Sequence, residues 1–155
     1  MGAHVGRDVI VEFALKDEAA TVLEADWKVL GMMRDKNLNI AWETVDTTAD
    51  KSPDFTKTSL VTFKSVEFSG GGVSYDDEVH NQETLEAHVI NPPAGTGNQP
   101  KAWFRLTYPS GKMYTGPFIV SAWSNASPYA DAATWTITAA SNGAVVMTPA
   151  PAPAP

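Results

Sequence analysis

Apolar and polar residues alternate along several stretches of the chain, and this period of two is typical of β-strands. Every second side chain of residues 9–15 is apolar, and residues 38–45 place Leu38, Ile40 and Trp42 opposite polar neighbours. A further alternating stretch occupies residues 27–33. These three patterns predict half-buried strands in the first third of the chain.

Residues 59–69 are also strand-like, but their apolar positions change phase along the run. The apolar residues of one parity are Val61 and Phe63, and those of the other parity are Val66 and Phe68. One inserted residue shifts an alternating pattern in this way. The sequence therefore predicts a β-bulge near Lys64 and Ser65.

Two hairpins are predicted in the last third of the chain. Residues 101–108 and 112–123 flank a Pro-Ser-Gly turn, and Gly116-Pro117 interrupts the second of these strands. The other hairpin is predicted from a second pair of alternating runs and a turn signal. It joins residues 132–139 through Asn142-Gly143 to a short strand in residues 144–148.

One helix is predicted, over residues 75–89. Ser74 and Asp77 have the spacing of a capping box, and the acidic residues that follow suit the positive end of the helix dipole. Leu85 and Val89 lie four residues apart, so they share one face of a helix. We expect this face to pack against a sheet.

The tally of about eight strands and one helix predicts a mainly β fold, in which two packed sheets form a β-sandwich or half-barrel with a flanking α-helix. Residues 1–149 suit a single domain, since 155 residues can bury one core. Residues 150–155 alternate Pro and Ala, so we expect a disordered tail.

Residues 46–57 show no hydrophobic period and contain Pro53, so they predict a long exposed loop. Phe55 is its one large apolar side chain. Loops of this length are uncommon in compact domains and often carry a contact. Residues 92–100 form a second loop, rich in Pro and Gly.

Composition narrows the classes of function that remain. The chain has no cysteine, which excludes disulfides, thiolate nucleophiles and sulfur-ligated metals. No segment has the length of a membrane span, and the N-terminus lacks the apolar core of a signal peptide, so we expect a soluble protein made in the cytoplasm. The net charge of −7 argues against tight binding to nucleic acid.

The charge is also unevenly distributed. Residues 1–86 carry 17 acidic and 8 basic residues, whereas residues 87–155 carry 1 acidic and 3 basic residues. The two halves of the chain could therefore attract each other between subunits.

The sequence predicts no enzyme, no catalytic residue, no metal site and no cofactor. The three histidines, His4, His80 and His88, are too widely spaced for a shared metal and are interpreted as surface residues. The acids at residues 76–78 lack the register of a calcium loop. The five tryptophans are assigned to core or interface packing, because Trp42 and Trp135 fall on the apolar sides of alternating strands.

The order of these elements, together with four short motifs, resembles the major tail tube proteins of long-tailed phages and of gene transfer agents. The motifs are Val-Asp-Thr-Thr at residues 45–48, Ser-Val-Glu-Phe-Ser-Gly-Gly-Gly-Val at 65–73, Tyr-Thr-Gly-Pro-Phe-Ile-Val at 114–120 and Ala-Thr-Trp at 133–135. The resemblance spans almost the whole chain. The loop at residues 92–100 and the Pro-Ala tail depart from the pattern of the family.

The resemblance implies a structural virion protein whose hexameric rings stack into a tail tube, with a β-barrel around the channel that conducts DNA during ejection. Its partners would be further copies of itself, tape-measure and tail-end proteins and passing DNA that it does not bind specifically, with no membrane. The protein would be assembled in the host cytoplasm and reside in the virion tail.

Two groups of residues would carry these contacts. The loop would contact the next ring through Asp46, Asp50, Lys51, Asp54, Phe55 and Lys57. The candidates for the channel lining are Asn39, Glu43 and Glu67, because an acidic surface does not hold sliding DNA.

Two other classes of function remain open. A monomeric β-sandwich that binds carbohydrate or decorates a surface would need the same strands and would use an exposed tryptophan. A hydrolase would need a pair of carboxylates, and no pair among the 18 acidic residues is marked by its spacing.

Overall fold

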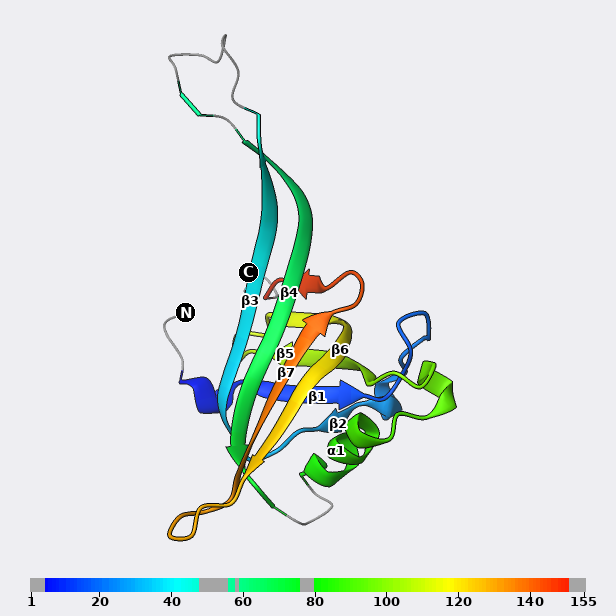
Figure 1. The fold of residues 1–155 in the computed structure, drawn as a ribbon, viewed down its shortest axis with the longest axis vertical. Helices are drawn as coiled ribbons and strands as arrows, with labels where there is room; N and C mark the ends of the chain where they lie inside the picture. Colours follow the sequence, from blue (N-terminus) through cyan, green and yellow to red (C-terminus); the bar gives the residue numbers. More distant parts are fainter. Residues whose placement is uncertain (1–4, 48–55, 58, 76–79, 151–155) are drawn as a thin grey trace, which may run out of the picture.

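The computed structural model describes residues 5–47, 56–57, 59–75 and 80–150. Within these residues the chain forms eight strands and one α-helix (Figure 1). The strands are β1 (Ile10–Ala14), β2 (Lys28–Val29), β3 (Met33–Asp46), β4 (Ser59–Val73), β5 (Lys101–Thr107), β6 (Met113–Ala126), β7 (Thr134–Ser141) and β8 (Val146–Thr148). The helix is α1 (Gln82–Ile90), and short 3-10 helices occupy η1 (Gly6–Asp8), η2 (Glu24–Asp26) and η4 (Ala94–Thr96).

All eight strands belong to one antiparallel sheet. The strand order is β2-β1-β5-β6-β7-β4-β3, and β8 pairs with β6 beside this path. The mainly β fold with one helix is confirmed. The two expected sheets are joined, because the first half of β6 pairs with β5 and its second half pairs with β7.

The sheet curls so that its inner face encloses the core. Phe68 on β4 and Phe104 on β5 have ring centroids 5.2 Å apart, although β6 and β7 separate their strands. Three interstrand steps in a flat sheet would separate the two backbones by about 14 Å. The chain also passes from Val29 on β2 to Met33 on β3, the two ends of the strand order, in four residues. The result is an open half-barrel.

The core consists of large apolar side chains from both halves of the curled sheet and from the helix. Phe104 also packs edge to face on Phe118, with ring centroids 5.6 Å apart. Burial of each such side chain contributes about 1.5–3 kcal/mol. The largest fully buried apolar residues are Trp135, Phe13, Phe68, Phe104, Phe118, Leu85, Leu106, Ile137 and Val11.

The helix begins later than predicted. It starts at Gln82 rather than at Tyr75, and Tyr75, His80 and Asn81 are not helical. Asp77, the second residue of the predicted capping box, lies outside the described residues. The expected packing face is correct, since Leu85 is fully buried and Val89 packs against the core.

The side chain of Gln82 explains this late start. Its amide nitrogen donates to the carbonyl oxygens of Gly31 and Val73, both at 2.9 Å. Its amide oxygen accepts from the backbone N–H of Tyr75 at 2.9 Å. These bonds tie Gln82, Val73 and Tyr75 to the junction between β2 and β3. Asn81 then enters the helix through a left-handed conformation, with φ of 58°.

The last predicted hairpin is wrong, because its short second strand pairs with a different strand. β8 pairs with residues 113–115 of β6 and not with β7. β7 cannot accept it, because β4 and β6 already occupy both of its edges. Gly116-Pro117 does not interrupt β6, which continues through both residues. At this point the neighbour of β6 changes from β8 to β7.

The phase change in β4 is confirmed as a bulge. Trp42 pairs with Lys64 and Thr44 pairs with Val61, so β4 holds one extra residue between these pairs. The bulge therefore precedes the predicted position at Lys64 and Ser65 by one or two residues.

Candidate assembly surfaces

The hairpin of β3 and β4 extends beyond the rest of the sheet. The two strands pair from Met33 and Gly72 to Asp46 and Ser59, but β4 pairs with β7 only from Glu67 onward. In the far half of the hairpin, β3 and β4 consequently pair only with each other among the described strands. Figure 1 shows it projecting away from the other strands.

This projecting half carries large apolar side chains that the folded chain leaves exposed. Phe63 is 73% exposed and Trp42 is 50% exposed. The remaining members are Ile40, Val45, Leu60 and Val61. A concentration of exposed apolar residues of this kind marks a contact with another protein. We call these six residues, which lie on both faces of the hairpin, the hairpin patch.

The pairing register separates the two faces of the sheet. Leu38 pairs with Phe68 and Ile40 pairs with Val66, which places these residues on the core side. Asn39 pairs with Glu67 on the opposite side. Because side chains alternate along a strand, the ladders of β4 and β7 extend this opposite face across the sheet.

Beside the core the opposite face of the sheet is polar and partly acidic, whereas Val45 and Leu60 make its outer end apolar. The polar side chains placed there by the β3, β4 and β7 ladders are Asp35, Asn37, Asn39, Ser65, Glu67, Ser69, Thr134, Thr136 and Thr138. None of the residues that these ladders place on this face is Lys or Arg. We call this surface the polar face.

The candidate residues fall into different parts of the molecule. Asn39 and Glu67 are cross-strand neighbours on the polar face, and Glu43 is exposed further along β3. Asp46 ends β3, and Lys57 is exposed before β4. The other loop candidates, Asp50, Lys51, Asp54 and Phe55, lie outside the described residues, as does the Pro-Ala tail beyond residue 150.

The tryptophans divide between core and surface. Trp135 is fully buried as predicted, and its indole Nε1–H donates to the carbonyl oxygen of Val73 at 3.2 Å. Trp42 is not in the core, because its strand extends beyond the residues that would cover it. An interface role for Trp42 stays a prediction.

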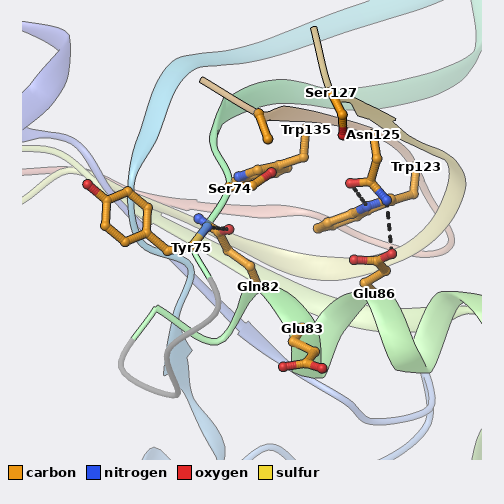
Figure 2. Close-up of a pocket in the computed structure, with 10 residues that line it drawn as sticks. Ser74, Tyr75, Gln82, Glu83, Glu86, Trp123, Asn125, Ser127 and Trp135 are labelled. Atoms are coloured by element: carbon orange, nitrogen blue, oxygen red, sulfur yellow. Dashed lines mark hydrogen bonds between the residues drawn. The ribbon is translucent and has the colours of Figure 1, made fainter. Parts of the chain in front are cut away.

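A pocket of about 340 Å³ lies between α1 and the adjoining ends of β6 and β7 (Figure 2). Trp123 lines it and stacks on Trp135, with ring centroids 5.0 Å apart and planes 5° apart. The Trp123 Nε1–H donates to Asn125 Oδ1, and Asn125 Nδ2 donates to Glu86 Oε1 at 2.9 Å. This chain of hydrogen bonds fixes the indole. Sequence reasoning missed the pocket, since no local pattern connects α1 with β6.

His88 corrects the prediction that the histidines lie on the surface. It is 5% exposed, and its Nε2–H donates to the carbonyl oxygen of Lys101 at 2.8 Å. Burial lowers the pKa of the imidazole below its ordinary value, against the smaller opposite effect of this hydrogen bond. The neutral ring links α1 to β5. Among the described residues no group of three or more His, Asp or Glu side chains could hold a metal ion.

Most basic side chains around the core are engaged within the chain. Arg105 bonds Glu12 at 2.9 Å and Glu24 at 3.2 Å, and its guanidinium lies 4.6 Å from the centre of the Trp27 ring. The hydrogen bond from Arg105 lowers the pKa of Glu24. Lys101 pairs with two carboxylates in a similar way. No α-helix among the described residues is long and apolar enough to cross a membrane.

Comparison with known proteins identifies the same architecture in solved assemblies. The profile of the phage tail tube protein family matches residues 3–147. A chain from the virion of a native gene transfer agent superposes with a TM-score of 0.72 at 22% identity, covering 95% of this chain and 100% of that chain. The tail of an empty gene transfer agent particle, computed with C6 symmetry, gives the same values.

The tail tube of SPP1 superposes with a TM-score of 0.64 at 12% identity, covering 92% of this chain and 77% of that chain. No curated protein sequence matches the chain.

Proposed function

Because the chain belongs to the phage tail tube protein family, a family of structural proteins, we propose that its copies form hexameric rings that stack into the tail tube of a phage or phage-like particle. The observation that carries this proposal is the projecting β3–β4 hairpin. Its exposed apolar residues and its outer strand edge, which pairs with no strand among the described residues, would both be covered by contact with further copies.

Ring closure would use two free strand edges. β3 is the last strand of the sheet, so its outer edge pairs with no strand in the part of the chain that the structure describes. The second half of β6, from Ser121 to Ala126, pairs with β7, and none of the described strands lies on its other side. Joining β3 of each copy to β6 of the next would make one closed barrel and remove both edges. The C6 symmetry of the gene transfer agent tail supports six copies.

The polar face would then line the channel. Lys and Arg bind phosphates by displacing condensed counterions, and this face offers neither at its ladder positions. Glu43 and Glu67 would add negative charge that repels DNA. Asn39 and Glu67 would face the lumen as neighbours, so DNA would pass without being held.

The hairpin patch would contact the adjacent ring. The hairpin extends along the strand direction, past the level at which β7 ends. Residues at its end, including Asp46, Lys57 and Phe55 in the connecting loop, would set the register between rings. Tape-measure and tail-end proteins would contact the assembled tube, which would form in the host cytoplasm and remain in the virion tail.

Electron microscopy of the purified protein tests the proposal. Negative-stain images at increasing concentration are expected to show six-fold rings and then tubes, because heterologous contacts between identical chains close into rings that stack. Particles that remain monomeric at the highest attainable concentration would refute the tube. They would favour the monomeric binding module instead.

The charge of the polar face gives a second prediction. Tubes of Glu67→Lys are expected to bind a short DNA duplex at low salt and to release it as salt rises, because each new phosphate contact frees counterions. Tubes of the natural sequence should bind no duplex. The measurement is fluorescence anisotropy of labelled duplex across a salt series.

Asp8→Lys is the matched control for this experiment. Asp8 is exposed in η1, outside the polar face, and the substitution changes the net charge by the same amount. Equal DNA binding by the two variants would show that net charge alone acts, and would remove the lumen assignment of Glu67.

A further inference from the structure

Arg34 is a basic side chain left without an ion pair among the described residues. It is the extra residue of a bulge at the start of β3, because Met33 pairs with Gly72 and Asp35 pairs with Gly71. A bulge redirects a side chain and is often found at a sheet edge. The nearby Lys36 is engaged differently, since its Nζ donates to the carbonyl oxygens of Gly6 and Val9.

The pocket beside α1 is acidic, in contrast to the basic side chain of Arg34. Its lining includes the indole of Trp123, the Asn125–Glu86 hydrogen bond and the carboxylate of Glu83, and it includes no Lys or Arg. Glu83 is exposed and has no ion pair among the described residues. An aromatic ring held rigidly beside two carboxylates is the environment that a guanidinium prefers.

The arginine and the pocket lie at the same level of the sheet, on opposite edges. The register runs from Met33 across to Gly72, from Gly72 to Trp135 and from Trp135 to Asn125. Arg34 therefore lies three strands away from Asn125, whereas Ser74 and Tyr75, which also line the pocket, follow the neighbouring strand β4. Arg34 is exposed and forms no ion pair with the pocket of its own chain among the described residues.

A ring brings the two together. The proposed joint places β3 of one copy beside β6 of the next, so Arg34 of one copy comes to the edge that carries the pocket of its neighbour. Resting on that proposed ring, we propose that Arg34 enters the Trp123–Glu86 pocket of the neighbouring copy. It would lie against the indole and pair with Glu83 and Glu86 of that copy, so the occupant of the pocket is a second copy of this chain.

Charge complementarity and strand continuity both favour this occupant. The same contact would join β3 to β6 by backbone hydrogen bonds and would pair their flanking charges, which fixes the register of the joint. The planar guanidinium can stack and form two hydrogen bonds at once, whereas an ammonium ion cannot. The variant Arg34→Lys should therefore retain only part of the contribution of this contact to ring formation.

A charge-swap experiment tests the inference. Arg34→Glu and Glu83→Lys are each expected to raise the concentration needed for ring formation by about tenfold or more, because each places like charges in the joint. The double variant Arg34→Glu/Glu83→Lys is expected to recover most of the loss. The measurements are light scattering after size exclusion and negative-stain images, with circular dichroism to verify folding.

Lys28→Glu is the control, since Lys28 is exposed on β2 and the substitution changes the charge by the same amount. If Arg34→Glu assembles like Lys28→Glu, or if the double variant is no better than either single one, the contact does not exist. Failure of the natural chain to form rings would instead refute the proposed function, so the two failures are distinguishable.

Discussion

The double variant Trp42→Ser/Phe63→Ser is expected to lose tube formation at concentrations where the natural chain assembles, while its monomer stays folded. Both side chains are half or more exposed in the single chain, so their removal costs the fold little. Burial of each against another copy would contribute about 1.5–3 kcal/mol. Losing both weakens every ring-to-ring contact by about two to four powers of ten in the association constant.

The measurement is the yield of sedimentable tubes, with thermal unfolding of the monomer as the test of the fold. Leu23→Ser/Ile90→Ser is the matched control, because it removes two apolar side chains of similar exposure outside the hairpin. Normal tubes from the Trp42→Ser/Phe63→Ser variant would show that the hairpin patch is not an assembly surface. Equal loss in the control would show that general surface hydrophobicity drives association.

Phe104→Ala is expected to lower the free energy of unfolding by about 3–5 kcal/mol. The ring is fully buried and packs on both Phe68 and Phe118, at the place where the sheet curls over itself. The cavity cannot collapse easily, because neighbouring strands fix the backbone on both sides. A domain of this size has a total stability of about 5–15 kcal/mol, so the variant should be close to unfolding.

Urea titration of the monomer measures this loss. Tyr129→Ala is the control, since Tyr129 is fully exposed and its replacement should change stability by less than about 0.5 kcal/mol. A loss of under about 1 kcal/mol for Phe104→Ala would mean that the two halves of the curled sheet are not packed through this ring.

Periodicity predicted the strands well, because side-chain alternation is a local property. Residues 9–15, 38–45 and 101–108 correspond to β1, the body of β3 and β5. The single curled sheet was not predictable in the same way. It depends on β6 changing its neighbour along its length, and strand pairing between distant segments leaves no local signal.

The errors in the start of the helix and in the partner of β8 have the same cause, because both depend on contacts between distant segments. The helix was predicted to begin at Tyr75 from a local capping pattern, but Gln82 forms hydrogen bonds with Gly31 and Val73 that no local pattern reveals. The turn at Asn142 correctly marked the end of β7. The partner of β8 was wrong because both edges of β7 were already occupied.

The candidate site was partly predictable. Alternation placed Asn39 and Glu67 on the polar side of their strands, and the register makes them neighbours. Alternation also placed Trp42 on an apolar face, but it could not show that this face extends beyond the core. The Trp123 pocket requires α1 and β6 to be brought together, which only the fold does.

The order in which the strands emerge during synthesis has a consequence for the cell. β3 and β4 follow each other directly in the chain, whereas β1 ends at Ala14 and its partner β5 begins only at Lys101. A hairpin forms in about 1–10 μs, while translation at about 5–20 residues per second needs several seconds more to complete β7. The hairpin proposed to contact other copies can thus exist on the ribosome before the core does. Neighbouring ribosomes on one messenger would carry such hairpins close together, where pairing between unfinished chains would compete with folding.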